Sequence, residues 1–207
     1  GQGRPSRQPF VAALLEGGQT LLRQPAILGA IGLMAVVGGL AYPVFGMMPA
    51  FAEEVLGVDA VGLGILLAAG ALGSVLGTVV VAHLGRQRRG RTLALTALLL
   101  PCLVAVFAAT RQLWSSSLLL VGIGIALLIL QSLAITLVQL HILDRVRGRV
   151  MSIYSLLHAG SDTTGNVVVG TAAVVVGLPV ALAAGGLLAL LFALVVWLWL
   201  PAIRRLD

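Results

Sequence analysis

Residues 117–140 read SLLLVGIGIALLILQSLAITLVQL, and none of these 24 residues is charged. A helix needs about 20 such residues to cross the roughly 30 Å hydrocarbon core of a bilayer. Because every backbone polar group must be paired inside the protein there, only helices and closed barrels can cross. Barrel strands would alternate polar and apolar residues, and this stretch does not. It therefore predicts a membrane-spanning helix.

Five further apolar runs accompany that stretch. Soluble domains are near a quarter charged, whereas this chain of 207 residues is 59% hydrophobic and 10% charged. We therefore expect an all-α integral membrane protein, in which a lead-in over 1–24 precedes a six-helix bundle over 25–207. The expected spans are about 26–51, 61–82, 92–109, 117–140, 150–176 and 179–200.

The arginines predict the orientation. With six crossings, twelve of the arginines fall on one side, in the two termini and in the loops between spans two and three and spans four and five. Arg111 falls on the other side, with Glu53, Glu54 and Asp59. Because cytoplasmic loops collect positive charge, both termini are expected in the cytoplasm. The absence of lysine favours a GC-rich bacterium, and hence the bacterial cytoplasmic (inner) membrane, while the basic loops predict topology rather than a nucleic-acid partner.

The lead-in and the start of the chain carry two smaller expectations. Residues 8–24 combine apolar side chains such as Phe10 and Leu14 with polar ones, which is typical of an amphipathic helix in the membrane interface. The sequence begins Gly-Gln-Gly-Arg-Pro without a methionine. We therefore expect it to be a part of a longer chain.

Motifs for enzyme chemistry are not found in the sequence. It has no phosphate-binding GxxxxGK[ST], no zinc-binding HExxH and no GxSxG nucleophile turn. His83, His141 and His158 are too dispersed to form a ligand cluster. We therefore predict no enzyme activity, no metal site and no cofactor.

Two spans carry packing signals. In the second span, four small residues have the small-xxx-small spacing that lets helix backbones approach closely: Gly70, Gly73, Ser74 and Gly77. In the first span, Pro43 and Pro49 remove backbone donors and predict kinks.

The fifth span carries the most informative pair, His158 and Asp162, one helical turn apart. The same face includes Ser155, Asn166 and Val169. A carboxylate at membrane depth costs about 2.5 kcal/mol or more, so it should face protein or water. The pair could take up and release a proton. The alternative is a polar pair satisfied by a neighbouring helix or by the hydroxyls of the next two residues, without a coupling role.

The fourth span offers uncharged polar side chains over less than half of its circumference: Gln131, Ser132, Thr136 and Gln139. Such residues can line a cavity for an organic solute, and they can equally form hydrogen bonds between helices. We assign them to a substrate cavity as a hypothesis, together with Asn166 and Tyr42.

A resemblance to a known family rests on three segments. Residues 143–151 read LDRVRGRVM, and the segment resembles the D-x-x-RGRV sequence before the eleventh helix of major facilitator superfamily transporters of the enterobactin and macrolide exporter branch. The segments LLRQP over 21–25 and MPAFAEEVLG over 48–57 resemble the surroundings of the seventh helix in that branch. The chain thus resembles helices 7–12, the C-terminal half of such a transporter.

The resemblance implies a half built of two inverted three-helix repeats, which works only with a second six-helix bundle. That bundle would be the N-terminal half of the same protein or another chain. The implied function is secondary active, proton-coupled efflux of a small organic molecule by alternating access, in an antiporter. The implied cytoplasmic gating residues are Asp144, Arg147, Arg149, Arg86, Arg88 and Arg89.

Two departures limit what is carried over. The basic loop over 84–91 lacks the aspartate that precedes the arginines in the family, and His158 and Asp162 are not part of the family pattern. The role of that pair is therefore predicted from physics alone. A standalone six-helix scaffold or assembly subunit without transport activity is the alternative function.

Overall fold

The computed structural model describes residues 24–84, 89–142 and 144–200, and all of its regular elements are helices. The predicted lead-in over 1–24 lies outside the described residues except for Gln24. Five long helices follow the first, broken one: α6 (Ala60–His83), α7 (Arg89–Ala108), α8 (Leu113–His141), α9 (Asp144–Val176) and α10 (Leu178–Trp199). The all-α prediction is confirmed for this part of the chain.

The first helix is interrupted where its prolines lie. Its segments are α2 (Pro25–Gly32), the π-helix η1 (Leu33–Gly38), α3 (Gly39–Ala41), α4 (Pro43–Gly46), α5 (Met48–Ala50) and the π-helix η2 (Phe51–Val55). Tyr42 and Met47 are turn residues, each followed within two positions by a proline. Proline cannot donate a backbone hydrogen bond, so the regular pattern breaks at these points, as predicted.

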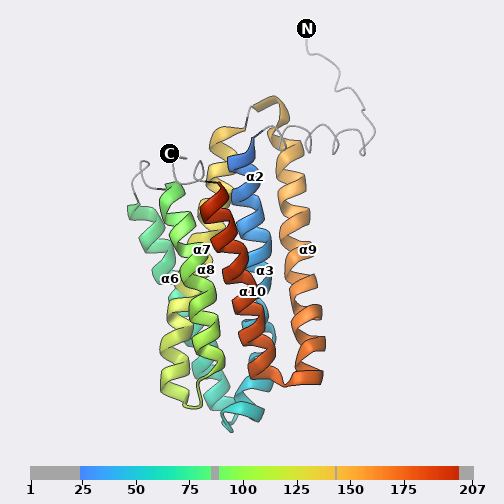
Figure 1. The fold of residues 1–207 in the computed structure, drawn as a ribbon. Helices are drawn as coiled ribbons and strands as arrows, with labels where there is room; N and C mark the ends of the chain where they lie inside the picture. The colour runs from blue at the N-terminus through green and yellow to red at the C-terminus, as the bar shows by residue number, and fades with distance from the viewer. Residues whose placement is uncertain (1–23, 85–88, 143, 201–207) are drawn as a thin grey trace.

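The broken helix is nevertheless the centre of the bundle. Its residues Ile31, Met34, Val37 and Phe51 are almost fully buried. It contacts α8 through α2, α9 through α3, and α10 through η1. Figure 1 shows it in blue between α8, α9 and α10.

Close backbone contact joins α6 to α8. A Cβ atom on Gly73 would collide with the carbonyl oxygen of Val121, and one on Gly124 would collide with that of Gly70. Only glycine permits this approach, which confirms the packing role predicted for the small residues of the second span. The helix α7 packs against both α8 and α10.

Within the described residues, five helices are long and apolar enough to cross a membrane: Pro25–Gly46, Ala60–His83, Arg89–Ala108, Leu113–His141 and Leu178–Trp199. These five agree with five of the predicted spans. The remaining predicted span, 150–176, lies in α9. This helix has 33 residues but is not among the five helices apolar enough to cross, because it carries more polar side chains. In Figure 1, α9 nevertheless runs alongside the other helices over the height of the bundle.

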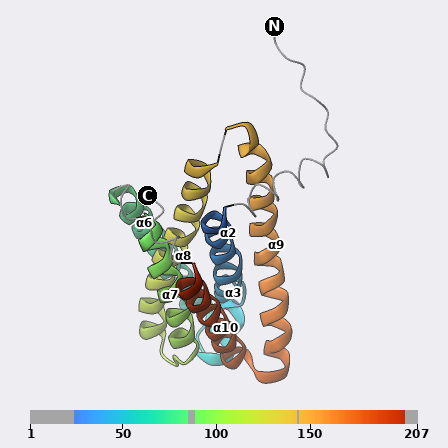
Figure 2. The same cartoon turned by 45° about the horizontal axis from the view of Figure 1, so that its top comes forward.

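Basic and acidic residues lie at opposite ends of the bundle. The end of α6, the beginning of α7, the end of α8 and the beginning of α9 lie at one end of the bundle (Figure 1). Arg89, Arg147 and Arg149 belong to that end, whereas Glu53 and Glu54 belong to the opposite end. The helices α6 and α9 occupy opposite edges of the bundle (Figure 1 and Figure 2), and α6 is the least buried of the five apolar helices.

Candidate functional site

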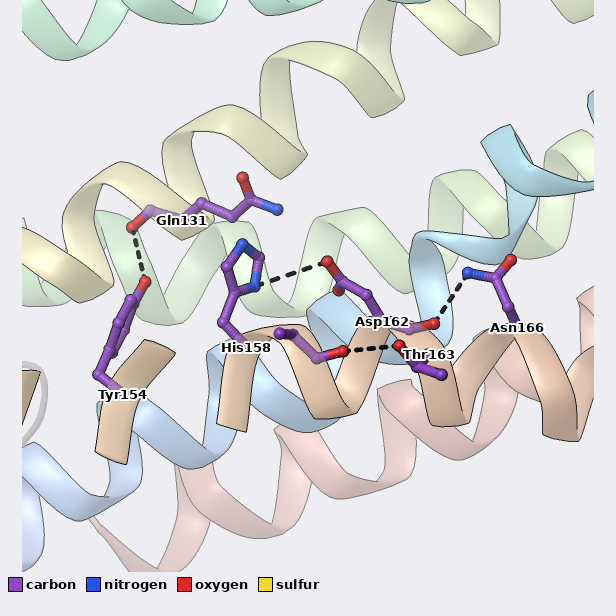
Figure 3. A network of polar contacts seen from close by, with 7 residues as sticks. Gln131, Tyr154, His158, Asp162, Thr163 and Asn166 are labelled. Atoms are coloured by element: carbon purple, nitrogen blue, oxygen red, sulfur yellow. Dashed lines mark hydrogen bonds and ion pairs between the residues drawn. The ribbon is translucent and has the colours of Figure 1, made fainter. Parts of the chain in front are cut away.

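A polar stripe, Tyr154–His158–Asp162–Asn166, runs along α9 at four-residue intervals. Residues four apart lie on nearly the same side of a helix, one above the other. In Figure 3, Tyr154 points from α9 toward Gln131 of α8, whereas Asn166 at the other end of the stripe lies against Gly46 of the first helix. The stripe extends the pair predicted from the sequence by about one turn in each direction.

At the centre of the stripe, His158 Nδ1 lies 3.8 Å from Asp162 Oδ2. The His158 side chain is 36% exposed and that of Asp162 is 24% exposed. The pair is thus partly covered by the bundle but still open on one side. At this distance the two groups are not hydrogen-bonded, but a protonated histidine would form an ion pair with the carboxylate and stabilise its charge.

Neighbouring side chains hold the two ends of the stripe. Asn166 donates a hydrogen bond of 2.8 Å from Nδ2 to the backbone oxygen of Asp162, and its side-chain oxygen packs against Gly46. The hydroxyl of Tyr154 donates to the backbone oxygen of Gln131 in α8, at 3.5 Å. The Tyr154 ring is nearly buried, and its centroid lies 6.3 Å from that of His158.

Tyr154 was not predicted as a site residue, although its position four residues before His158 was visible in the sequence. The alternative partner Thr163 does not bond to Asp162, because its hydroxyl donates to the Ala159 carbonyl at 3.0 Å. Ser155, predicted for the same face, is exposed, and Val169 is buried in the core.

A cavity of about 340 Å³ lies between the first helix, α6 and α8. Small-molecule sites start near this size. Its polar lining includes Tyr42, Ser74 and Gln131, and its apolar lining includes Phe45, whose ring centroid lies 6.3 Å from that of Tyr42. Two of the predicted cavity residues, Tyr42 and Gln131, are therefore brought together.

Gln131 also links this cavity to the stripe on α9. It lines the cavity, and its backbone oxygen accepts the Tyr154 hydroxyl. We refer to the cavity and the stripe together as the polar chamber.

The other predicted cavity residues of α8 do not line this cavity. Thr136 donates from its hydroxyl to the Ser132 carbonyl at 2.6 Å, which satisfies it within its own helix. Ser132 and Thr136 are both partly buried, and Gln139 is exposed near the end of α8. Their assignment to a substrate cavity stays a prediction.

The predicted gating residues lie partly outside the described part of the chain. Arg86 and Arg88 lie outside it, as does the side chain of Asp144. Arg89 begins α7 and is partly buried, and Arg147 and Arg149 lie in the first two turns of α9.

Comparison with known proteins gives one clear result. The Major Facilitator Superfamily pattern matches residues 2–162, which is more than half of the chain. No protein with a curated description matches this chain. Members of this family are membrane transporters. The five apolar helices are consistent with this, because each is long and apolar enough to cross a lipid bilayer. The chain belongs to the major facilitator superfamily.

Proposed function

We propose that this chain is one six-helix bundle of a proton-coupled transporter that exports a small organic molecule by alternating access. The observation that carries the proposal is the polar chamber, in which Gln131 and Tyr154 connect the ionisable pair on α9 to a cavity of the size of a small solute. Ionisable side chains within a membrane protein mark proton and substrate pathways more often than packing. We infer the bacterial cytoplasmic membrane as the location, with both termini in the cytoplasm.

The polar chamber supports α9 as the sixth crossing helix. A lone helix with Asp162 and Asn166 would be costly in hydrocarbon, but a polar side turned toward protein or water removes much of that cost. The exposed sides of α6 and α9 then require a cover. A second bundle that covers both edges would close the chamber between the two halves, as the repeat architecture of such transporters requires.

The chemistry of the pair supports exchange of protons for substrate. When the chamber opens to one side, Asp162 can accept a proton, and its charge is neutralised before the bundles rock. When the chamber opens to the other side, the proton leaves and the carboxylate pairs again with His158. The proton and the substrate can shift the equilibrium between these two conformations only if each binds one conformation more tightly than the other.

The direct test replaces the carboxylate in the complete two-bundle transporter. Asp162→Asn keeps the size of the side chain but removes the titratable proton, so transport driven by a pH gradient should fall to background. Asp162→Glu should retain part of it. Transport of a panel of fluorescent amphipathic compounds into proteoliposomes, with and without a pH gradient, measures both.

Glu54→Gln is the matched control, because Glu54 is an exposed carboxylate at the far end of the bundle. That variant should transport like the unmodified protein. Full gradient-driven transport by Asp162→Asn, with normal amounts of protein in the membrane, would reject the coupling role.

The cytoplasmic arginines are proposed to stabilise one of the two conformations. Arg149→Ala should then lower the transport rate while leaving the affinity for substrate unchanged, because it shifts a conformational equilibrium and does not touch the chamber. Equilibrium binding and initial rates on the same preparation separate the two. Lost binding would show instead that Arg149 is needed for folding or for the site itself.

A further inference from the structure

The cavity between the first helix, α6 and α8 has walls without charge. None of its lining residues is an aspartate, glutamate, lysine, arginine or histidine. The same holds for residues 25–52, 60–82 and 113–140, the parts of the chain from which the walls are built. The ionisable pair His158–Asp162 belongs to α9 and is not part of the lining. A molecule in this cavity therefore meets only uncharged side chains among the described residues.

Two aromatic rings from the first helix line the cavity. The ring planes of Tyr42 and Phe45 are tilted by 53°, with centroids 6.3 Å apart. The Phe45 ring is held against α6, because a Cβ atom on Gly70 would collide with Phe45 Cε1. Aromatic rings bind one another by offset stacking or by edge-to-face contact. A planar ring in a ligand can therefore meet one of these two rings by its face and the other by its edge.

Polar groups of the lining are available to a ligand. Within the described part of the chain, neither the Tyr42 hydroxyl nor the Gln131 side-chain amide has a hydrogen-bond partner, since Gln131 binds Tyr154 through its backbone oxygen. Ser74 Oγ donates to the Gly70 carbonyl at 3.2 Å, so it offers a ligand only its lone pairs. A phenol and an amide both donate and accept. They suit a hydroxyl, carbonyl or amide group of a neutral molecule.

We propose that this cavity binds an uncharged aromatic molecule that also carries hydroxyl, carbonyl or amide groups. Such a molecule would be the exported substrate, a statement that rests on the proposed function. The cavity volume of about 340 Å³ lies near the lower end of the range for small-molecule sites. The part of the substrate held by this bundle is therefore compact.

An aromatic cation is the competing class of substrate, because positive charge is attracted to the faces of aromatic rings. That attraction is small compared with the cost of taking an unpaired charge out of water. A cation would therefore need a carboxylate in the lining, and the three walls provide none. An anion would lack a partner in the same way and would also be repelled by the electron-rich ring faces.

The first experiment measures equilibrium binding to the complete transporter in the absence of any ion gradient. Three fluorescent probes share a methoxycoumarin ring and differ in one substituent, which is an acetamide, an acetate or a trimethylammoniomethyl group. Fluorescence anisotropy gives the Kd of each probe. The uncharged acetamide should bind at least about tenfold more tightly than either charged probe, because only its binding leaves no charge unpaired.

The second experiment tests the aromatic contact with the uncharged probe. Phe45→Leu removes one ring of the lining and should weaken binding by about fivefold, which is typical of a lost aromatic pair. Phe192→Leu is the matched control, because this partly buried ring of α10 packs near Gly32 and does not line the cavity. Tyr42→Leu removes the second ring at a residue that is 38% exposed, where the effect on folding is small. Thermal unfolding verifies that each variant is folded.

Three results would overturn the proposal. Equal or tighter binding of a charged probe would show that a charge from α9 or from the second bundle selects the substrate. If Phe45→Leu and Tyr42→Leu bind the uncharged probe as Phe192→Leu does, the two rings do not contact it. No binding of the uncharged probe at about 1 mM would exclude this class of substrate. The coupling role of Asp162 is tested by gradient-driven transport and can fail or hold independently of these binding results.

Discussion

Asp162 and Gln131 have different parts in the polar chamber, and single substitutions can separate them. Asp162 offers a titratable proton, held 3.8 Å from His158. Gln131 offers two things: a side-chain amide in the cavity lining and a backbone oxygen for Tyr154. A side-chain substitution at Gln131 removes only the first. We therefore expect it to affect recognition of the substrate and not the packing of α9.

Gln131→Leu should change which compounds are carried. An unpaired polar group on a bound substrate costs about 1–3 kcal/mol, so polar compounds should lose about tenfold in relative transport while apolar ones are spared. Gln112→Leu makes the same change at an exposed position just before α8, outside the cavity lining, and should keep the original profile. Competition among a panel of compounds measures the profile, and identical profiles in the two variants would count against a substrate contact.

The sequence predicted that His158 and Asp162 lie close together, but it missed another member of the stripe. His158 and Asp162 were found because a charge in an apolar run is conspicuous, and their spacing brings them together in any helix. Tyr154 escaped because an aromatic residue in a membrane span is ordinary, and its partner is a backbone oxygen on another helix. Ser132 and Thr136 looked like cavity residues, but Thr136 is satisfied within its own helix.

At the level of helices, close glycine contacts fix where α9 meets the first helix. Pro43 cannot donate to the Gly39 carbonyl as the fourth residue of a regular helix would. The backbone of α9 approaches that same carbonyl at Gly165. Gly160 is only five residues away in the same helix but lies in open space. The two glycines therefore form a matched pair for testing the contact.

Gly165→Ala should destabilise the bundle, because one added methyl group forces α9 away from α3. Over-packing of this kind costs about 1–3 kcal/mol. Gly160→Ala adds the same methyl group without a clash and should leave stability unchanged or raise it slightly, since alanine favours a helix over glycine. Thermal unfolding of the purified protein in detergent distinguishes them. Equal melting temperatures would show that the α3–α9 contact is looser than described.

Helix positions were largely predictable, because long apolar runs between polar loops have few other structures available in a membrane. Five predicted spans correspond to helices apolar enough to cross. The sequence also predicted breaks at Pro43 and Pro49. The π-helical segments at Leu33–Gly38 and Phe51–Val55 were not predictable, since packing against neighbouring helices decides between the two hydrogen-bond patterns.

At the scale of the whole molecule, the positions of α6 and α9 at the edges of the bundle favour a second bundle that packs against them. The first helix is buried at the centre, while α6 and α9 lie at opposite edges of the bundle (Figure 1 and Figure 2). Trp114 and Trp199 are exposed near opposite ends of the bundle, as aromatic residues at the two membrane interfaces are. The family match assigns the chain to transporters, whereas the second bundle, the coupling ion and the direction are proposals.

The most direct test of this account asks whether α9 crosses the membrane with one side wet and the other shielded from water. The background is the complete transporter with Cys102→Ser, which removes the single cysteine of this chain, and with any cysteine of the second bundle also replaced by serine. Cysteines are then introduced one at a time by Asp162→Cys, Asn166→Cys, Leu157→Cys and Val168→Cys. Reaction with a hydrophilic maleimide is then measured in intact membranes. The account predicts reaction at positions 162 and 166 and protection at 157 and 168. Reaction at all four positions, or at none of them, would contradict it.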